Sequence, residues 1–287
     1  MKLFTARFVA PFALALATFA PSADAEPPAA RDAVTHRFAG DPDAQALALT
    51  LFDTYTDIVD SLPAELMDGG YRGTIRLLPA LPVGANRKHL AWVASAMQDF
   101  DDFFAAIVTH GPVRYRWRGL TFRFFRSVGR TTPSAFASNW TVAYNVNGSI
   151  VASPDAARET LFHEIFHLDD EDHGDWSPRH LTEVRNAIVR RCGARTACLA
   201  PYAPTSTIVR RGTYYAFQPG NDVHEYAAEV ALRWYREQRA MVRGEPLDAP
   251  PFKCGVDENR RAWEAIQDEF FGGVDLVPPC APPPSLP

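Results

Sequence analysis

The pattern of hydrophobic and polar residues predicts helices and strands throughout the chain. Apolar residues recur three and four positions apart over 42–59 and 86–109, which indicates two amphipathic helices. The first begins at Asp41-Pro42, a capping residue followed by proline at the first helical position. Alternating patterns predict strands over 71–78, 113–117 and 120–128, and a strand pair over 140–151. The turn expected in this pair is Asn147-Gly148, a strong hairpin signal.

Helical patterns dominate the second half of the sequence. Four helices are predicted there, over 153–169, 177–191, 221–241 and 257–271. The chain shows no internal repeat. A small early sheet followed by several helices predicts an α+β fold.

The first 25 residues have the layout of a signal peptide. Lys2 and Arg7 precede an apolar stretch over 8–20, and Ala23-Asp24-Ala25 matches a cleavage site. This stretch is shorter than the roughly 20 residues that cross a bilayer. We therefore expect export to the periplasm or the extracellular space, with no stable membrane insertion after signal removal.

The remaining chain divides by composition. Residues 26–40 are rich in alanine and proline and predict a loose leader, and the proline-rich residues 278–287 predict an extended tail. Residues 41–277 are expected to form the main domain, in which 41–130 can be a separate N-terminal subdomain.

Four cysteines in an exported protein predict two disulfides. Of the three pairings we favour Cys192–Cys198 with Cys254–Cys280, because each closes a local loop. The formal net charge is −5 and no long basic run is present, which argues against nucleic acid as a partner.

The segment His163-Glu164-Ile165-Phe166-His167 forms the pattern H-E-x-x-H inside a predicted helix. His163 and His167 are one turn apart, so both imidazoles can bind adjacent corners of a zinc tetrahedron. Glu164 is rotated about 100° around the helix and can act as base on a water molecule that the metal activates. The motif predicts a catalytic Zn²⁺ with His163 and His167 as ligands and Glu164 as general base.

A catalytic zinc needs a third protein ligand, and two regions offer one. His173 gives H-E-x-x-H-x-x-D-x-x-H, close to the metzincin pattern, but Asp170 stands where that family has glycine and no methionine turn follows. Glu225 begins a later predicted helix, with Glu229 one turn further along the same face. The spacing alone leaves Glu225, Glu229 and His173 as candidates.

The run Glu225-Tyr226-Ala227-Ala228-Glu229 resembles the E-[YF]-x-A-E segment of the lethal-factor-like metallopeptidases, gluzincins that include the Pro-Pro endopeptidases. Asp169 and Asp170 after H-E-x-x-H are also similar to that family. The resemblance implies a zincin-like domain in which Glu225 binds zinc and Glu229 orients a zinc-bound histidine.

A tyrosine shortly before the third ligand stabilises the oxyanion in that family. Tyr215-Ala216 resembles the family's Tyr-Ala pair but lies three residues further upstream, and the adjacent Tyr214 is an alternative.

These features together predict a zinc-dependent endopeptidase that hydrolyses a protein or peptide substrate. The substrate is expected to align along the strand pair at 140–151. Three alternatives stay open: a metzincin-like peptidase that uses His173, a non-catalytic, zinc-stabilised binding domain, and a zinc hydrolase that acts on a non-peptide bond or on peptidoglycan cross-links.

Overall fold

The computed structural model describes residues 27–69, 73–209 and 212–281. The predicted signal peptide, the start of the predicted strand at Tyr71 and residues 282–287 lie outside this range. Within the described residues, none of the helices combines the length and apolar character needed to cross a membrane.

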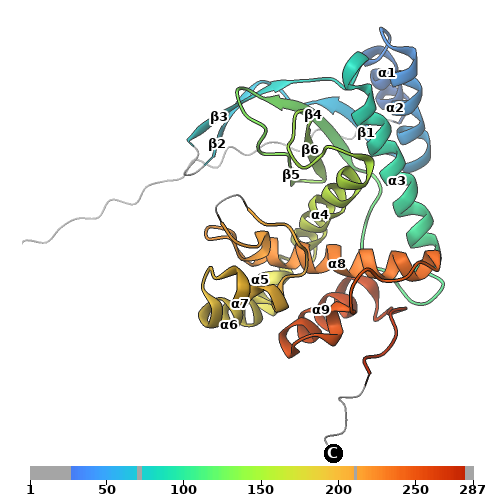
Figure 1. The fold of residues 1–287 in the computed structure, drawn as a ribbon. Helices are drawn as coiled ribbons and strands as arrows, with labels where there is room; N and C mark the ends of the chain where they lie inside the picture. The colour runs from blue at the N-terminus through green and yellow to red at the C-terminus, as the bar shows by residue number, and fades with distance from the viewer. Residues whose placement is uncertain (1–26, 70–72, 210–211, 282–287) are drawn as a thin grey trace, which may run out of the picture.

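The fold is mixed α+β, as predicted, with a small curled sheet at one end (Figure 1). Its path is β2-β3-β4-β6-β5, and β1 pairs with β4 in parallel. β4 and β6 are also parallel, while β2–β3, β3–β4 and β5–β6 are antiparallel. The strands are β1 (Ile58–Ser61), β2 (Glu65–Asp68), β3 (Thr74–Pro79), β4 (Thr121–Ser127), β5 (Ala135–Ser138) and β6 (Thr141–Asn145).

Helices extend from one face of the sheet to the opposite end of the molecule (Figure 1). They are α1 (Pro27–Arg37), α2 (Pro42–Tyr55), α3 (Arg87–Ile107), α4 (Pro154–Asp172), α5 (Trp176–His180), α6 (Thr182–Cys192), α7 (Thr196–Leu199), α8 (Val223–Arg243) and α9 (Asp257–Phe271). Short 3₁₀ turns are η2 (Gly84–Asn86), η3 (Ala200–Tyr202), η4 (Tyr215–Phe217) and η5 (Phe252–Cys254).

The main core lies between the sheet and the helices. Phe122 and Phe124 of β4 point into it, together with Val142 and Tyr144 of β6, because alternate residues of a strand face the same side. Phe125 faces the other side and belongs to a small second cluster. The main cluster contains residues from α1 to α9, so residues 41–130 share one sheet and one core with the rest of the chain.

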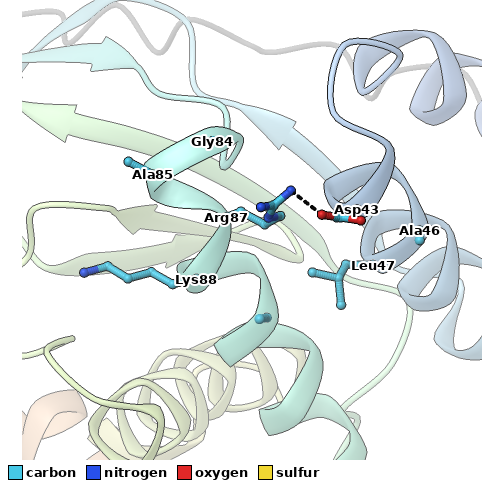
Figure 2. Close-up of a pocket in the computed structure, with 8 residues that line it drawn as sticks. Asp43, Ala46, Leu47, Gly84, Ala85, Arg87 and Lys88 are labelled. Carbon is cyan, nitrogen blue, oxygen red and sulfur yellow. Dashed lines mark hydrogen bonds and ion pairs between the residues drawn. The ribbon is translucent and has the colours of Figure 1, made fainter.

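The N-termini of α2 and α3 are joined by polar contacts. Asp41 caps α2 by accepting from the backbone N–H of Ala44 at 3.1 Å, and its other oxygen accepts from the Gly84 N–H at 2.7 Å. Arg87 at the start of α3 donates to Asp41 and to Asp43, each at 2.7 Å. Figure 2 shows Arg87 turned towards Asp43 across this junction. The predicted cap of α2 therefore also fixes where α3 begins.

The predicted hairpin at 140–151 is wrong. The hairpin is β5–β6, and its turn is Asn139-Trp140, both with positive φ of 49° and 55°. Two positive φ values mark a type I′ turn, whose twist matches the flanking strands. At the expected turn, the Gly148 N–H bonds back to the Asn145 carbonyl at 2.8 Å, and the chain continues to α4 without a returning strand.

Two further predictions need correction. Residues 113–117 form no strand, because the N–H groups of Arg114 and Tyr115 both donate to the carbonyl of Phe270 at the end of α9. The loose leader predicted over 26–40 is not seen in its described part: Pro27–Arg37 form α1, and Val34 in this helix and Phe38 directly after it are completely buried. This pair, four residues apart, supplies the apolar contact that a short helix needs to be stable.

Both predicted disulfides are confirmed. Cys192 is bonded to Cys198 and Cys254 to Cys280, with Cα–Cα distances of 5.4 and 5.2 Å. The second bond ties residues 278–281, which form no helix or strand, to η5.

Candidate active site

Helix α4 carries the H-E-x-x-H motif through the centre of the molecule (Figure 1). Ser153 caps it by accepting from the N–H of Ala156 at 3.2 Å, and Pro154 occupies its first turn. The helix is buried on several sides, and Leu161, Ile165 and Phe166 are fully inaccessible to solvent. This packing holds the backbone of the motif in place.

Helix α8 packs against α4 (Figure 1), and two of its acidic residues contact His163 of α4. Asp222 caps α8 by accepting from the N–H of His224 at 3.0 Å. Tyr226, Val230 and Trp234 bury the apolar side of the helix. Glu225 and Glu229, which lie one turn apart, therefore face α4.

Three side-chain atoms converge between the two helices. The Nε2 atoms of His163 and His167 lie 3.1 Å apart, and Glu225 Oε2 lies 3.1 Å from the first and 3.7 Å from the second. In tetrahedral zinc sites with bonds near 2.0–2.1 Å, two ligand atoms are about 3.3 Å apart. The triangle has the size of one face of such a tetrahedron, so these residues fit a zinc ion.

The positive form of His163 and the negative form of Glu225 stabilise each other. Burial lowers the pKa of His163, but its hydrogen bonds to Glu225 and Glu229 outweigh burial and raise the pKa well above the usual histidine value. Burial raises the pKa of Glu225, and the bonds from His163 and His167 then bring it far below the usual carboxylate value. A negative carboxylate beside two imidazoles is a donor set suited to a divalent cation.

Glu229 supports His163 from behind. Its Oε1 lies 3.2 Å from His163 Nδ1, and the side chain is 6% exposed. When Nδ1–H donates to a carboxylate, the lone pair of Nε2 is left free for a metal. Glu229 is therefore placed to orient a ligand, and it does not join the triangle itself.

Glu164 and Tyr215 face the same cleft, which has a volume of about 600 Å³. The cleft is bounded by β5 on one side and by η4 and the first turn of α8 on the other, with α4 between them. Burial raises the pKa of Glu164, although the nearby His163 and His167 oppose this shift. A carboxylate with raised pKa is well suited to accept and return a proton.

Tyr215 lies beside the triangle of His163, His167 and Glu225. Its ring meets the His163 ring edge-on at 5.9 Å, and it lines the same cleft as Glu164 and Glu225. Burial, followed by the charges of Glu225 and Glu164, raises the pKa of the phenol, so it remains an O–H donor at neutral pH. Tyr214 is not among the residues that line the cleft and packs against the core.

His173 lies away from the triangle. Its Nδ1 is 2.7 Å from Glu269 of α9 and its ring packs on Phe270. Asp170 is fully buried and accepts from the N–H and hydroxyl of Ser177, at 2.7 and 2.5 Å, so the chain turns into α5 without bringing His173 back. The metzincin-like arrangement with His173 as third ligand is therefore not formed.

The rim of the cleft contains residues that sequence reasoning missed. His224 bridges Asp175 at 2.6 Å and Asp222 at 3.1 Å, and Asp170 lies close enough for the three residues Asp170, Asp175 and His224 to form a second potential cation group. Burial lowers the pKa of His224 but the bonds to both aspartates raise it more. The contacts of His224 with both aspartates explain this cluster as an ion-pair network.

The wall formed by β5 was also missed, because its turn lacks the glycine that marks most type I′ hairpins. Thr205, whose hydroxyl donates to Glu229, gave no signal at all, since the two residues are 24 positions apart in no recognisable motif.

Comparisons with known proteins do not assign this site to a known family. Neither family models, nor characterised proteins, nor solved structures give a match to the chain. Any functional conclusion must therefore come from the arrangement of His163, Glu164, His167, Tyr215 and Glu225.

Proposed function

We propose that this chain is a zinc-dependent endopeptidase with a zincin-like catalytic domain. The observation that carries the proposal is the convergence of His163, His167 and Glu225 at the spacing of zinc ligands. Glu164 and Tyr215 face the same cleft, so a base and a hydrogen-bond donor accompany the metal ligands. A purely structural zinc site needs neither of them.

His163, His167 and Glu225 would hold the ion. Zinc bound there acidifies a water molecule and polarises a carbonyl group. Glu164 accepts the proton from the attacking water as the new carbon–oxygen bond forms. It then delivers the proton to the leaving nitrogen as the carbon–nitrogen bond breaks, which completes hydrolysis with Glu164 unchanged.

Tyr215 supplies a neutral donor for the developing negative charge. Its phenol lines the cleft close to Glu225 and Glu164, and its hydroxyl can donate to a carbonyl oxygen of a bound substrate. A fixed donor aimed at an oxyanion stabilises the transition state more than the ground state.

The open edge of the sheet suits an extended peptide. β5 is the last strand of the sheet and Ala135, Phe136 and Ala137 line the cleft. A peptide can pair with such an edge through its backbone, largely independent of its sequence. This edge takes the place of the strand pair at 140–151 that the sequence suggested.

Export remains part of the proposal. The two disulfides fit an oxidising compartment, such as the periplasm or the extracellular space.

Glu164→Gln tests the proposal directly. The variant should bind zinc like the parent and keep its thermal stability, because Glu164 is not a ligand. Hydrolysis of casein and of a fluorogenic peptide library should fall by about 10²–10⁴-fold or more, the usual contribution of a general base. Zinc content is measured by atomic emission on the same samples.

The outcomes separate the remaining functions. Zinc binding by both proteins with no peptide hydrolysis by the parent would support the zinc-stabilised binding domain instead. Near-normal hydrolysis by Glu164→Gln would refute the assigned base.

A further inference from the structure

Glu229 is a buried carboxylate with two partners on opposite oxygens. Oε1 faces Nδ1 of the ligand His163 at 3.2 Å, and Oε2 accepts the hydroxyl hydrogen of Thr205. The residues Glu229 and Thr205 are each only 5% exposed. A chain of contacts therefore leads from the Thr205 hydroxyl through Glu229 to the imidazole beside the metal triangle.

The hydroxyl has a physical role in this chain. A buried carboxylate with one unsatisfied oxygen is unfavourable and tends to rotate or to bind a proton. Either change would weaken the acceptor of His163 Nδ1–H and loosen the direction of Nε2. Thr205 holds the carboxylate in the plane that His163 requires.

The backbone near Thr205 is fixed at two points. The Pro201 carbonyl accepts from Nδ2 of Asn259 in α9 at 2.9 Å, and the Thr207 carbonyl accepts from the N–H of Tyr215 in η4 at 2.8 Å. Thr205 lies between these anchors, so the hydroxyl is delivered by a tethered segment.

We propose that Thr205 is a positioning residue of the metal site, which sets the affinity for zinc by fixing Glu229 and through it His163. This inference rests on the proposed zinc site, but it concerns a residue outside the metal ligands and outside the cleft lining.

The test compares three variants of the full chain. Thr205→Val keeps the shape of the side chain and removes the donor, so zinc affinity should fall by about 10–100-fold, the usual effect of losing a supporting group of a ligand. Thr205→Ser restores the hydroxyl and should bring zinc affinity back towards the parent value. Affinity is measured by competition with a chromogenic chelator.

Thr213→Val is the matched control. Thr213 is also fully buried, lies in the same connection between α7 and α8, and its hydroxyl oxygen has no hydrogen-bond partner within the described residues. Loss of this hydroxyl should leave zinc affinity unchanged, although the same chemical group is removed from the same region.

A spectroscopic readout distinguishes positioning from general destabilisation. The Co²⁺-substituted Thr205→Val protein should show altered visible d–d bands, whereas Thr213→Val should match the parent. If Thr205→Val does not fold, as judged by circular dichroism without metal, Thr205→Ala replaces it.

Parent-like zinc affinity and Co²⁺ spectrum in the folded Thr205 variants would overturn the inference, while zinc binding by the parent would leave the proposed function intact. Failure of the parent to bind zinc would overturn both.

Discussion

Helices α4 and α8 both bring two residues spaced one turn apart to the site, yet they use this spacing differently. On α4, His163 and His167 point their Nε2 atoms at each other, 3.1 Å apart. On α8, Glu225 reaches Nε2 of His163 at 3.1 Å, while Glu229 reaches Nδ1 of the same ring at 3.2 Å. In the proposed zinc site, α4 would supply two ligands, and α8 would supply one ligand and one supporting carboxylate.

The difference follows from the way the helices pack. A repeat of four residues keeps two side chains on one face, about one 5.4 Å turn apart along the axis. The imidazole of His163 contacts Glu225 and Glu229, which lie on successive turns of α8, so each turn contacts a different nitrogen of the ring. A spacing of four residues therefore predicts that two side chains lie on the same face of a helix, but it does not predict that they have the same role in the site.

Removal of the two glutamates one at a time should separate these tasks, with the largest expected effect at Glu225. Glu225→Gln removes a ligand charge, so zinc affinity should fall by more than about 100-fold, the upper range for supporting groups. In Glu229→Gln, the zinc affinity should fall by only about 10–100-fold, because Glu229 supports a ligand and is not one itself. Isothermal titration or chelator competition gives both values, and equal losses would contradict the division of roles.

Loosening the packing of the helices should have a smaller effect on the metal. Asp99 of α3 accepts from Tyr235 at 2.5 Å and Arg239 at 2.8 Å, both of α8, and lies 3.7 Å from Arg158 of α4. Asp99→Asn removes the negative partner of the partly buried Arg239 and Arg158, and the free energy of unfolding should fall by about 3 kcal/mol at neutral pH, the upper range for hydrogen bonds to charged groups. The zinc-to-protein ratio should remain one.

The contribution of the Asp99 charge can be identified from the pH dependence of the free energy of unfolding, measured by urea denaturation of the metal-free protein. Burial raises the pKa of Asp99, but the bonds from Arg239 and Tyr235 lower it more, so the folded value lies below the unfolded one. The stabilisation is thus present above about pH 4 and is lost as the pH falls through the folded pKa. The free energies of unfolding of the parent and of Asp99→Asn should become equal at acidic pH. A difference that stays constant with pH would show that the charge of Asp99 does not contribute to stability.

Substitution of Asp57 should have the smallest effect on stability, at a position outside the proposed metal site. Burial raises the pKa of this carboxyl to about 7, although the N–H of Leu120, which donates to its Oδ1 at 2.8 Å, opposes the shift. Its Oδ2 has no hydrogen-bond partner in the part of the chain that the structure describes. The folded state therefore binds the extra proton, and stability falls as the pH rises from about 4 to about 7.

Asp57→Asn should remove the cost of burying an ionised carboxylate at high pH. The free energy of unfolding should rise by about 1–2 kcal/mol at pH 8, because the cost of burying a carboxamide offsets part of the cost that is removed. Near pH 4 the gain should vanish, and zinc affinity should not change at either pH. A gain that is equal at both pH values, measured by thermal or urea unfolding, would contradict the raised pKa.

The parts of the fold that depend on neighbours in sequence could be predicted. The caps Asp41 and Ser153 begin helices where expected, and both disulfides join cysteines that close local loops. H-E-x-x-H places two donors together because one helical turn is enough to do so.

The parts that depend on long-range packing could not. The β5–β6 turn uses Asn139-Trp140 in place of a glycine, and His173 is drawn to Glu269 of α9, almost a hundred residues away. Thr205 finds Glu229 only after α8 has packed against α4. No local pattern encodes such contacts, because their partners are chosen by tertiary structure.

The most direct test of the central claim is a crystal structure of the purified chain grown with Zn²⁺ and phased or verified at the zinc absorption edge. One strong anomalous peak should appear, bound by Nε2 of His163, Nε2 of His167 and the carboxylate of Glu225, with Glu229 on Nδ1 of His163. A peak bound by His173, a peak bound directly by Glu229, or no peak between α4 and α8 would refute the proposed zinc site.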